Sequence, residues 1–346
     1  MSNRPAVATL LRVAVQIVGF AIGLALLAWC VDLAFSAENR VQLQRLSEAA
    51  PLRIAALLAC SFATIVLNGL IFHRTLVPVR RLRTVDVLAV NAVASFLNYL
   101  PFKASVISRF VIHNRRDRVP IAQIGAWLAA VGAGALIALG PFVLVSLWRG
   151  EIDAVWIVAG ITGVIALAAM TIALARRFSG DDGRRRMERL ANALRLPMRE
   201  RVLRSRLFAD AHSGLNMLAD PVSLGVVLAL RLADLAVQTA RFLIAAQLLD
   251  IALSPGQALL FALVYFFIGV ITPFGMLGTR EGGTVGVAVL VGMSEAGYEA
   301  FAAVPLLVTA TEAMVSLTLA GISIAWLRPD RLLRAPDAPD AYDRPA

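Results

Sequence analysis

Lysine, histidine and cysteine are all scarce in this 346-residue chain, which has one lysine, three histidines and two cysteines. Cys30 and Cys60 fall within apolar runs without metal-ligand spacing, so we expect neither a disulfide framework nor a metal site. The sequence also lacks a P-loop, a Gly-x-Ser-x-Gly motif and a soluble segment long enough to hold a catalytic centre. These shortages predict no cofactor and no catalytic residues, and they do not favour an enzyme.

Charged residues are few for a chain of this length. Only 16% of the residues are charged, whereas 59% are hydrophobic and the mean hydropathy is +0.76. This composition is too apolar for a soluble globule and predicts an all-α, polytopic membrane protein. The net charge of +10 comes from arginines that lie mainly between the apolar runs. Since no folded nucleic-acid-binding module accompanies them, we expect no nucleic-acid partner.

Six apolar runs are long enough to cross a bilayer, whose core needs roughly 20 helical residues. They are residues 10–31, 54–72, 121–147, 154–175, 222–249 and 300–327. We expect residues 1–330 to form a single integral membrane domain. A disordered cytoplasmic tail, rich in proline, aspartate and alanine, is expected at residues 331–346.

Two further apolar segments, residues 85–111 and 257–291, are each interrupted by a Pro-Phe dipeptide, at Pro101 and Pro273. Proline inside a membrane helix removes an amide donor and opens the backbone where water cannot satisfy it. Such breaks persist where they line a cavity or are buried in protein. Interrupted segments in corresponding places of two halves are typical of a transporter binding site.

The distribution of arginines predicts the topology of these segments. Arginines flank both ends of the first broken segment, so the positive-inside rule keeps both ends in the cytoplasm and predicts a re-entrant hairpin. With both chain termini inside, the loop at 176–206, which contains 11 arginines, is also cytoplasmic, and the second hairpin enters from the outer face. The sequence therefore predicts six transmembrane helices and two oppositely oriented re-entrant hairpins in a bacterial-type inner membrane. The alternative is eight plain spans with two proline kinks.

Four polar residues lie along one face of the fifth predicted helix: Arg231, Asp234, Gln238 and Arg241. An arginine at the bilayer centre costs at least about 2.5 kcal/mol, so this face is expected to meet a cavity or its own partners. Asp234 alone cannot neutralise two guanidiniums. Either Glu281 or Glu312 supplies the balance, or an anionic substrate does.

The two breaks carry further candidates for substrate binding. Lys103 and Arg109 follow the first break, where the N-terminus of a half-helix would offer free amides to a phosphate or carboxylate. After the second break, Gly278 would let the backbone approach a ligand, and Arg280 and Glu281 follow. The predicted substrate-binding set is Lys103, Arg109, Arg231, Asp234, Gln238, Arg241, Arg280, Glu281 and Glu312.

Both breaks also resemble the motifs of a known family. Asn98-Tyr99-Leu100-Pro101 and the following Arg109 resemble Asn-x-x-Pro-x-x-x-Gly-Glu-x-x-Arg, but Ser105 and Val106 replace the usual glycine and glutamate. Residues 273–282 resemble a second pattern, which ends in Gly-x-Arg-Glu-Gly. The hairpin-break residues are Asn98, Pro101, Pro273, Gly275, Gly278 and Gly282. Over residues 10–326 the chain is similar to the transmembrane region of lysylphosphatidylglycerol synthases and to related stand-alone flippase-like membrane proteins.

The resemblance implies that the protein moves a lipid, or a lipid-linked polar head group, between leaflets. Only a short tail follows residue 327 in place of the aminoacyltransferase domain of full-length relatives, so lysine transfer is not expected. The expected partners are membrane lipids, either an anionic phospholipid or a polyprenyl-linked lipid, and a homo-oligomer is left open. One alternative is a transporter for a small anionic solute. Another is a membrane-embedded lipid-modifying enzyme, or its accessory subunit, that uses intramembrane carboxylates as acid or base.

Overall fold

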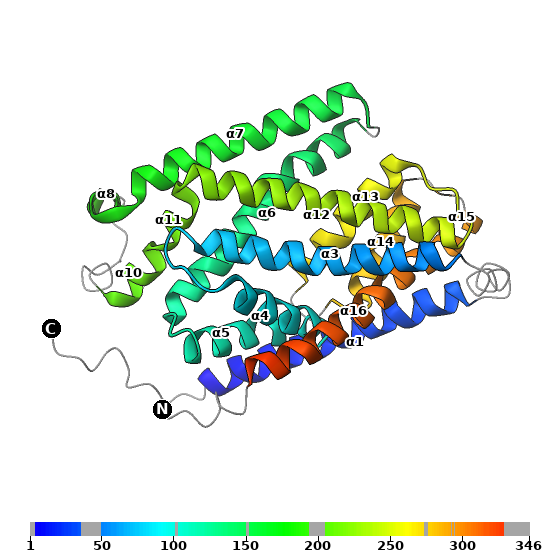
Figure 1. Ribbon diagram of the computed structural model, residues 1–346, viewed down its shortest axis with the longest axis horizontal. Helices are drawn as coiled ribbons and strands as arrows, with labels where there is room; N and C mark the ends of the chain where they lie inside the picture. Colours follow the sequence, from blue (N-terminus) through cyan, green and yellow to red (C-terminus); the bar gives the residue numbers. More distant parts are fainter. Residues whose placement is uncertain are drawn as a thin grey trace. The chain divides into compact units, whose positions relative to one another are not determined.

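The structure is a computed structural model that describes residues 4–35, 50–100, 103–149, 152–193, 205–272, 276–291, 293 and 295–328. Every regular element in these residues is an α-helix (Figure 1). Six helices are long and apolar enough to cross a membrane: α1 (Arg4–Ala34), α3 (Pro51–Leu76), α6 (Ile121–Arg149), α7 (Ala154–Phe178), α12 (Pro221–Leu248) and α16 (Ala303–Leu327). The predicted all-α class is confirmed for these residues, and the six predicted runs coincide with six candidate spans, as in a multi-pass membrane protein.

Two of the remaining helices are apolar but short. α4 (Thr84–Leu97) has 14 residues and α13 (Pro255–Ile271) has 17. They extend about 21 and 26 Å, less than the ~30 Å hydrocarbon core of a bilayer. The other helices described are α5 (Ala104–Arg115), α8 (Gly180–Ala193), α10 (Arg206–His212), α11 (Gly214–Ala219), α14 (Thr279–Leu290) and α15 (Glu295–Phe301).

α4 and α5 form an antiparallel pair on either side of the first break. Arg109 on α5 donates to Asn91 Oδ1 on α4 at 2.6 Å. Arg116, just after α5, donates to Asp86 Oδ1 near the start of α4 at 2.8 Å. Because the end of the second helix lies beside the start of the first, the chain doubles back and does not continue as one kinked span.

α13 and α14 form a second antiparallel pair around the second break. They pack directly against each other, with Gly269 of α13 facing Arg280 and Gly283 of α14 facing Ile268. A Cβ on Gly283 would lie 2.3 Å from Ile268 Cδ1, so the absence of a side chain permits this close packing. The two broken segments are therefore both folded as helical hairpins.

The chain forms two compact units, each assembled from segments distant in sequence. The first contains Met1–Ile65, Ala92–Ile107 and Asp234–Gly321, and the second contains Val66–Asn91, Ser108–Ala233 and Ile322–Ala346. In the second unit, α6 and α7 run side by side (Figure 1), and Gly160 leaves room for the ring of Phe142. The buried Trp127 belongs to the core of this unit and donates its indole N–H to Phe72 O at 2.9 Å.

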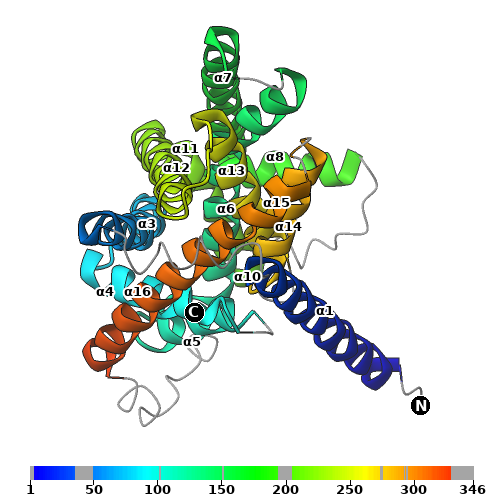
Figure 2. The ribbon, with the colours of Figure 1, turned by 90° about the vertical axis from the view of Figure 1, so that its right-hand side faces the viewer.

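In the first unit, α1 packs on α14 at a pair of glycines (Figure 2). Gly278, directly before α14, has a φ of 79°, and a Cβ there would lie 1.7 Å from Gly23 O on α1. Gly282, one turn later, faces Leu26. Small residues four apart let membrane helices approach closely. Gly278, which the sequence predicted would let the backbone approach a ligand, here lets it approach α1.

We expect Gly278→Ala to lower the thermal stability of the protein in detergent. The positive φ alone costs a non-glycine residue about 1–3 kcal/mol, and the new methyl group would collide with the backbone of Gly23. Gly286→Ala on the same helix is the matched control, because nothing lies within 4 Å of a Cβ at that position. Alanine is the better helix former, so its melting temperature should equal or exceed that of wild type. Equal melting temperatures for the two variants would contradict the α1–α14 packing.

Candidate functional site

Four charged residues of the first unit come together in apolar surroundings. Arg241 lies on α12, Arg280 and Glu281 on α14, and Glu312 on α16. Arg241 and Glu281 are fully buried and Arg280 is 3% exposed, whereas the side chain of Glu312 is 14% exposed. We refer to these four residues as the charge cluster. Since an unpaired charge is costly in such surroundings, the partners of each member decide what the cluster can do.

Glu312 links the two arginines of the charge cluster. Arg241 donates to Glu312 Oε2 at 2.9 Å and to Gln238 Oε1 at 2.7 Å. Arg280 Nη1 donates to Glu312 Oε1 at 3.4 Å. One carboxylate is therefore shared by two guanidiniums. With both carboxylates ionised, the four formal charges of the cluster cancel, and Glu312 supplies the balance that Asp234 alone could not.

Arg280 also lies against two tyrosine rings. Its Cζ is 4.2 Å from the ring centroid of Tyr265 on α13 and 5.7 Å from that of Tyr99, which follows α4. A cation–π contact of a desolvated guanidinium contributes about 2 kcal/mol. Even so, Nε and Nη2 of Arg280 and Nε of Arg241 make no hydrogen bond within the part of the chain that the structure describes. Both guanidiniums therefore retain donors for an added acceptor.

Glu281 has a separate set of partners. Its Oε1 accepts a hydrogen bond from Thr309 of α16, whose hydroxyl oxygen is also 2.7 Å from Tyr265 Oη. Its Oε2 has no hydrogen-bond partner among the described residues. Glu281 thus contributes charge to the cluster while it hydrogen-bonds to Thr309, and this leaves Glu312 to bind both arginines.

The two interrupted segments meet close to this cluster. Met276, which precedes α14, donates its backbone N–H to the carbonyl of Asn98 at the end of α4, at 3.2 Å. Tyr99, the next residue, is the one that faces Arg280. The predicted break residues Pro101, Pro273 and Gly275 lie outside the described residues, so their role stays a prediction. What the structure does bring together are the residues on either side of the two breaks.

A new helix starts where the sequence predicted it, one residue after Lys103. α5 begins at Ala104, and the carbonyl of Lys103 accepts the N–H groups of Val106 and Ile107. Lys103 itself has a φ of 50°, in the left-handed region that few non-glycine residues adopt. Its side chain is exposed. A contact between Lys103 and a substrate therefore stays a prediction.

Two further arginines of the predicted set bind amides in the second unit. Arg109 donates to Asn91 and lies 3.8 Å from the ring centroid of Phe72. Arg231 donates to Asn68 Oδ1 at 3.0 Å. Both guanidiniums are at least nine-tenths buried. These amides are neutral acceptors, and each satisfies part of the donor capacity of its guanidinium.

The predicted polar face of α12 is buried along its whole length. Arg231, Asp234, Gln238 and Arg241 are each at most 6% exposed. This agrees with the expectation that the face does not meet lipid. The roles of these residues in binding a substrate stay predictions.

Sequence reasoning did not select Tyr265, Asn68 or Asn91, although a weak indication was available for each. Tyr265 is one of only four tyrosines in the chain and lies in an apolar run. The two asparagines lie in the apolar runs of α3 and α4. A polar side chain in such a run indicates a partner on another helix. The sequence does not say which partner, because the contacts join positions far apart in the chain.

We expect Glu312→Ala to destabilise the folded protein strongly, because it leaves two buried guanidiniums without their shared carboxylate. Removal of one partner from a buried ion pair typically costs about 3–5 kcal/mol. The control is Glu188→Ala, which removes the carboxylate of a partly exposed pair with Arg184 on α8 and should cost less than about 1 kcal/mol. Thermal unfolding in detergent compares the two. A similar melting temperature for both variants would show that Glu312 does not hold the cluster together.

Comparison with known protein families matches residues 16–325 to the lysylphosphatidylglycerol synthase TM region. No match was found among curated proteins, and none among solved structures. The matched residues include both helical hairpins and the whole charge cluster. Since the match covers far more than half of the chain, this protein belongs to the lysylphosphatidylglycerol synthase TM-region family.

Proposed function

We propose that this protein is a lipid flippase-like transporter that moves an anionic phospholipid, or a lipid-linked polar head group, between the leaflets of an inner membrane. Its family membership and its six candidate spans indicate a lipid-related function in a membrane. The observation that carries the proposal of transport is the charge cluster. Two buried arginines share one carboxylate and still retain donors without partners among the described residues.

An anionic head group would exchange with Glu312 for the two guanidiniums. Phosphate offers several acceptor oxygens and matches the planar fork of arginine, so it would satisfy the donors that Arg241 and Arg280 have left over. Glu312 is the most exposed member of the arginine–carboxylate contact, and its bond to Arg280 is long at 3.4 Å. Protonation of Glu312 would release both arginines at once. Entry of the anion would then be coupled to uptake of a proton.

The two antiparallel pairs support a site near the bilayer midplane. Each pair contains an apolar helix too short to cross the membrane, and Asn98 and Met276 are hydrogen-bonded beside the two breaks. Hairpins that enter from opposite faces and stop part-way would meet in this manner. We therefore propose two oppositely oriented re-entrant hairpins, with both chain termini in the cytoplasm.

Lipid exchange can be measured in reconstituted vesicles with a fluorescent phosphatidylglycerol whose outer-leaflet copies are bleached by an impermeant reductant. We expect Arg280→Met to slow exchange roughly tenfold to a hundredfold, because a hydrogen bond to a charged group contributes about 1.5–3 kcal/mol. This variant keeps the Arg241–Glu312 pair, so the protein should remain folded, and its melting temperature checks this. Arg280→Lys keeps the charge but loses the planar fork and should have an intermediate rate.

Arg184→Ala is the control for this assay, because it removes an arginine from a partly exposed ion pair on α8 and should exchange lipid like wild type. Wild-type rates in folded Arg280→Met and Arg241→Met proteins would contradict the assignment of the charge cluster. Uptake of soluble glycerol phosphate without lipid exchange would support the small anionic solute transporter. Loss of a lipid species from a deletion strain, as opposed to a change in its leaflet, would support the lipid-modifying enzyme.

Cysteine labelling in a variant without the two native cysteines tests the hairpins. We expect Arg83→Cys and Arg115→Cys, at the two ends of the first hairpin, to react with an impermeant maleimide from the cytoplasmic side only. Ala252→Cys and Val291→Cys, at the ends of the second hairpin, should react from the outer side only. All four positions are exposed. Labelling of the first two positions from opposite sides would overturn the re-entrant topology.

A further inference from the structure

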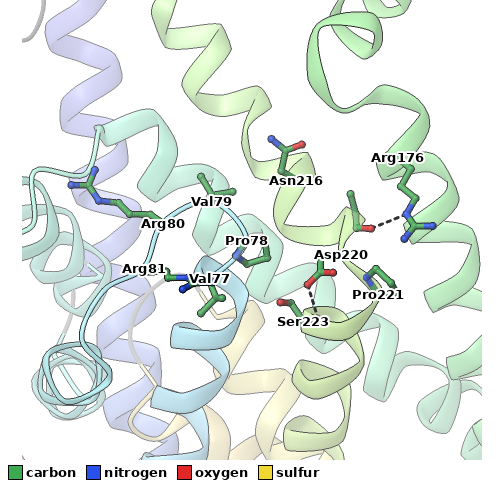
Figure 3. Close-up of a pocket in the computed structure, with 11 residues that line it drawn as sticks. Val77, Pro78, Val79, Arg80, Arg81, Arg176, Asn216, Asp220, Pro221 and Ser223 are labelled. Atoms are coloured by element: carbon green, nitrogen blue, oxygen red, sulfur yellow. Dashed lines mark hydrogen bonds between the residues drawn. The ribbon is translucent and has the colours of Figure 1, made fainter.

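The second unit contains an open cleft of about 770 Å³ at the ends of three candidate spans (Figure 3). α3 ends at Leu76 and α7 at Phe178, and α12 begins at Pro221. Residues from the segments beside these helix ends line the cleft. Because three helices long enough to span a membrane begin or end here, we expect the cleft to lie at the level where a membrane meets water. Its residues are separate from the charge cluster, which belongs to the first unit.

Three arginines line this cleft, and they are not equivalent. Arg80 points away from the cleft in Figure 3 and donates to the carbonyls of Asp117 and Arg118 at 2.7 and 3.2 Å. Arg81 and Arg176 lie on opposite sides of the cleft and are exposed (Figure 3). Among the described residues, the one hydrogen bond that the Arg176 guanidinium makes is from Nε to the carbonyl of Ala219, at 3.1 Å. That bond fixes the guanidinium at the rim and leaves its two terminal amino groups for a ligand.

One carboxylate opposes these charges. Asp220 lines the cleft and accepts a hydrogen bond from Ser223 N at 2.9 Å, at the start of α12. Hydrogen bonds from the side chain and backbone of Ser223 lower the pKa of Asp220, so it carries its charge at neutral pH. Three arginines against one aspartate leave the cleft positive. Any ligand attracted by charge is therefore an anion.

The rest of the lining is suited to a lipid. Val77, Pro78 and Pro221 provide apolar surface beside the arginines, and the Asn216 amide provides a polar group. Arginines near the ends of membrane spans attract anionic head groups with about 1 kcal/mol each. We propose that this cleft binds the phosphate group of an anionic phospholipid, between Arg81 and Arg176, at a site distinct from the transport cluster. A soluble phosphate ion offers the same acceptor oxygens to the arginines, and the experiment distinguishes it from the lipid.

The test is titration of the purified full-length protein in a neutral detergent with dioctanoyl-phosphatidylglycerol, with dioctanoyl-phosphatidylcholine and inorganic phosphate as separate arms. Microscale thermophoresis reports the apparent Kd. We expect Arg81→Ala and Arg176→Ala each to weaken binding of phosphatidylglycerol about fivefold. Asp220→Asn removes the opposing charge while it keeps a good N-cap residue, so it should strengthen binding by a similar factor. A purely structural cleft would not respond in opposite directions to these changes.

Arg177→Ala is the matched control, because it removes an exposed arginine next to Arg176 that does not line the cleft. An unchanged Kd in this variant, together with weak binding of phosphatidylcholine and of inorganic phosphate, is the expected result. Equal affinity for inorganic phosphate and phosphatidylglycerol would show that the cleft binds a soluble anion and would overturn the proposal of a lipid site. An equal loss of affinity in Arg177→Ala would show that general surface charge, and not the cleft, attracts the lipid. Unchanged lipid exchange in Arg81→Ala and Arg176→Ala proteins would show that the cleft and the transport cluster act separately.

Discussion

The first unit depends on one carboxylate shared by two buried guanidiniums. In apolar surroundings neither Arg241 nor Arg280 can remain charged without a partner, and Glu312 is the partner of both. Because both arginines need the same carboxylate, α12, α14 and α16 must come together at Glu312. α14 can reach it because its two faces have different residues: Gly278 and Gly282 lie against α1, while Arg280 and Glu281 point to the other helices. Without glycine on the first face, α14 could not approach α1, and the position of Arg280 would change with it.

The same cluster is poorly satisfied for a purely structural element. A buried ion pair stabilises a fold well only when its remaining donors and acceptors are also hydrogen-bonded. Here nitrogen atoms of both arginines and one oxygen of Glu281 are without partners among the described residues. The ring of Tyr265, 4.2 Å from Arg280, compensates only part of the cost of burying this charge. The face of the ring attracts the cation but offers no lone pair to accept a hydrogen bond. A ligand with acceptor oxygens would satisfy the remaining nitrogen atoms of the two arginines.

Much of the fold follows from composition, whereas the pairings within it do not. The six spans could be predicted because their lengths and hydropathy are local properties, and the buried face of α12 because a three-four spacing places four polar residues on one side. The partner of Arg241 could not be predicted, because Glu312 lies 71 residues away and Asp234 and Glu281 were equally available as partners. The sequence predicted that Gly278 lets the backbone approach a ligand, whereas in the structure it lets the backbone approach α1. A glycine indicates a close approach but does not identify the neighbour. Asn68 and Asn91 were overlooked because neutral amides carry no charge to balance.

The two hairpins differ in how their arginines are compensated, and the difference begins in the sequence. The motif that the first break resembles has a glutamate where this chain has Val106, and Arg109 binds the neutral Asn91 and the ring of Phe72. Among the described residues Arg109 pairs with no carboxylate, so its positive charge is not cancelled. In the second hairpin Arg280 is neutralised through Glu312. An anion that reaches the first hairpin therefore meets a cation held by dipoles alone, whereas one that reaches the second must displace a carboxylate or arrive with a proton. The two arginines therefore differ in what compensates their charge, and the difference lies in the residues that the fold places beside each of them.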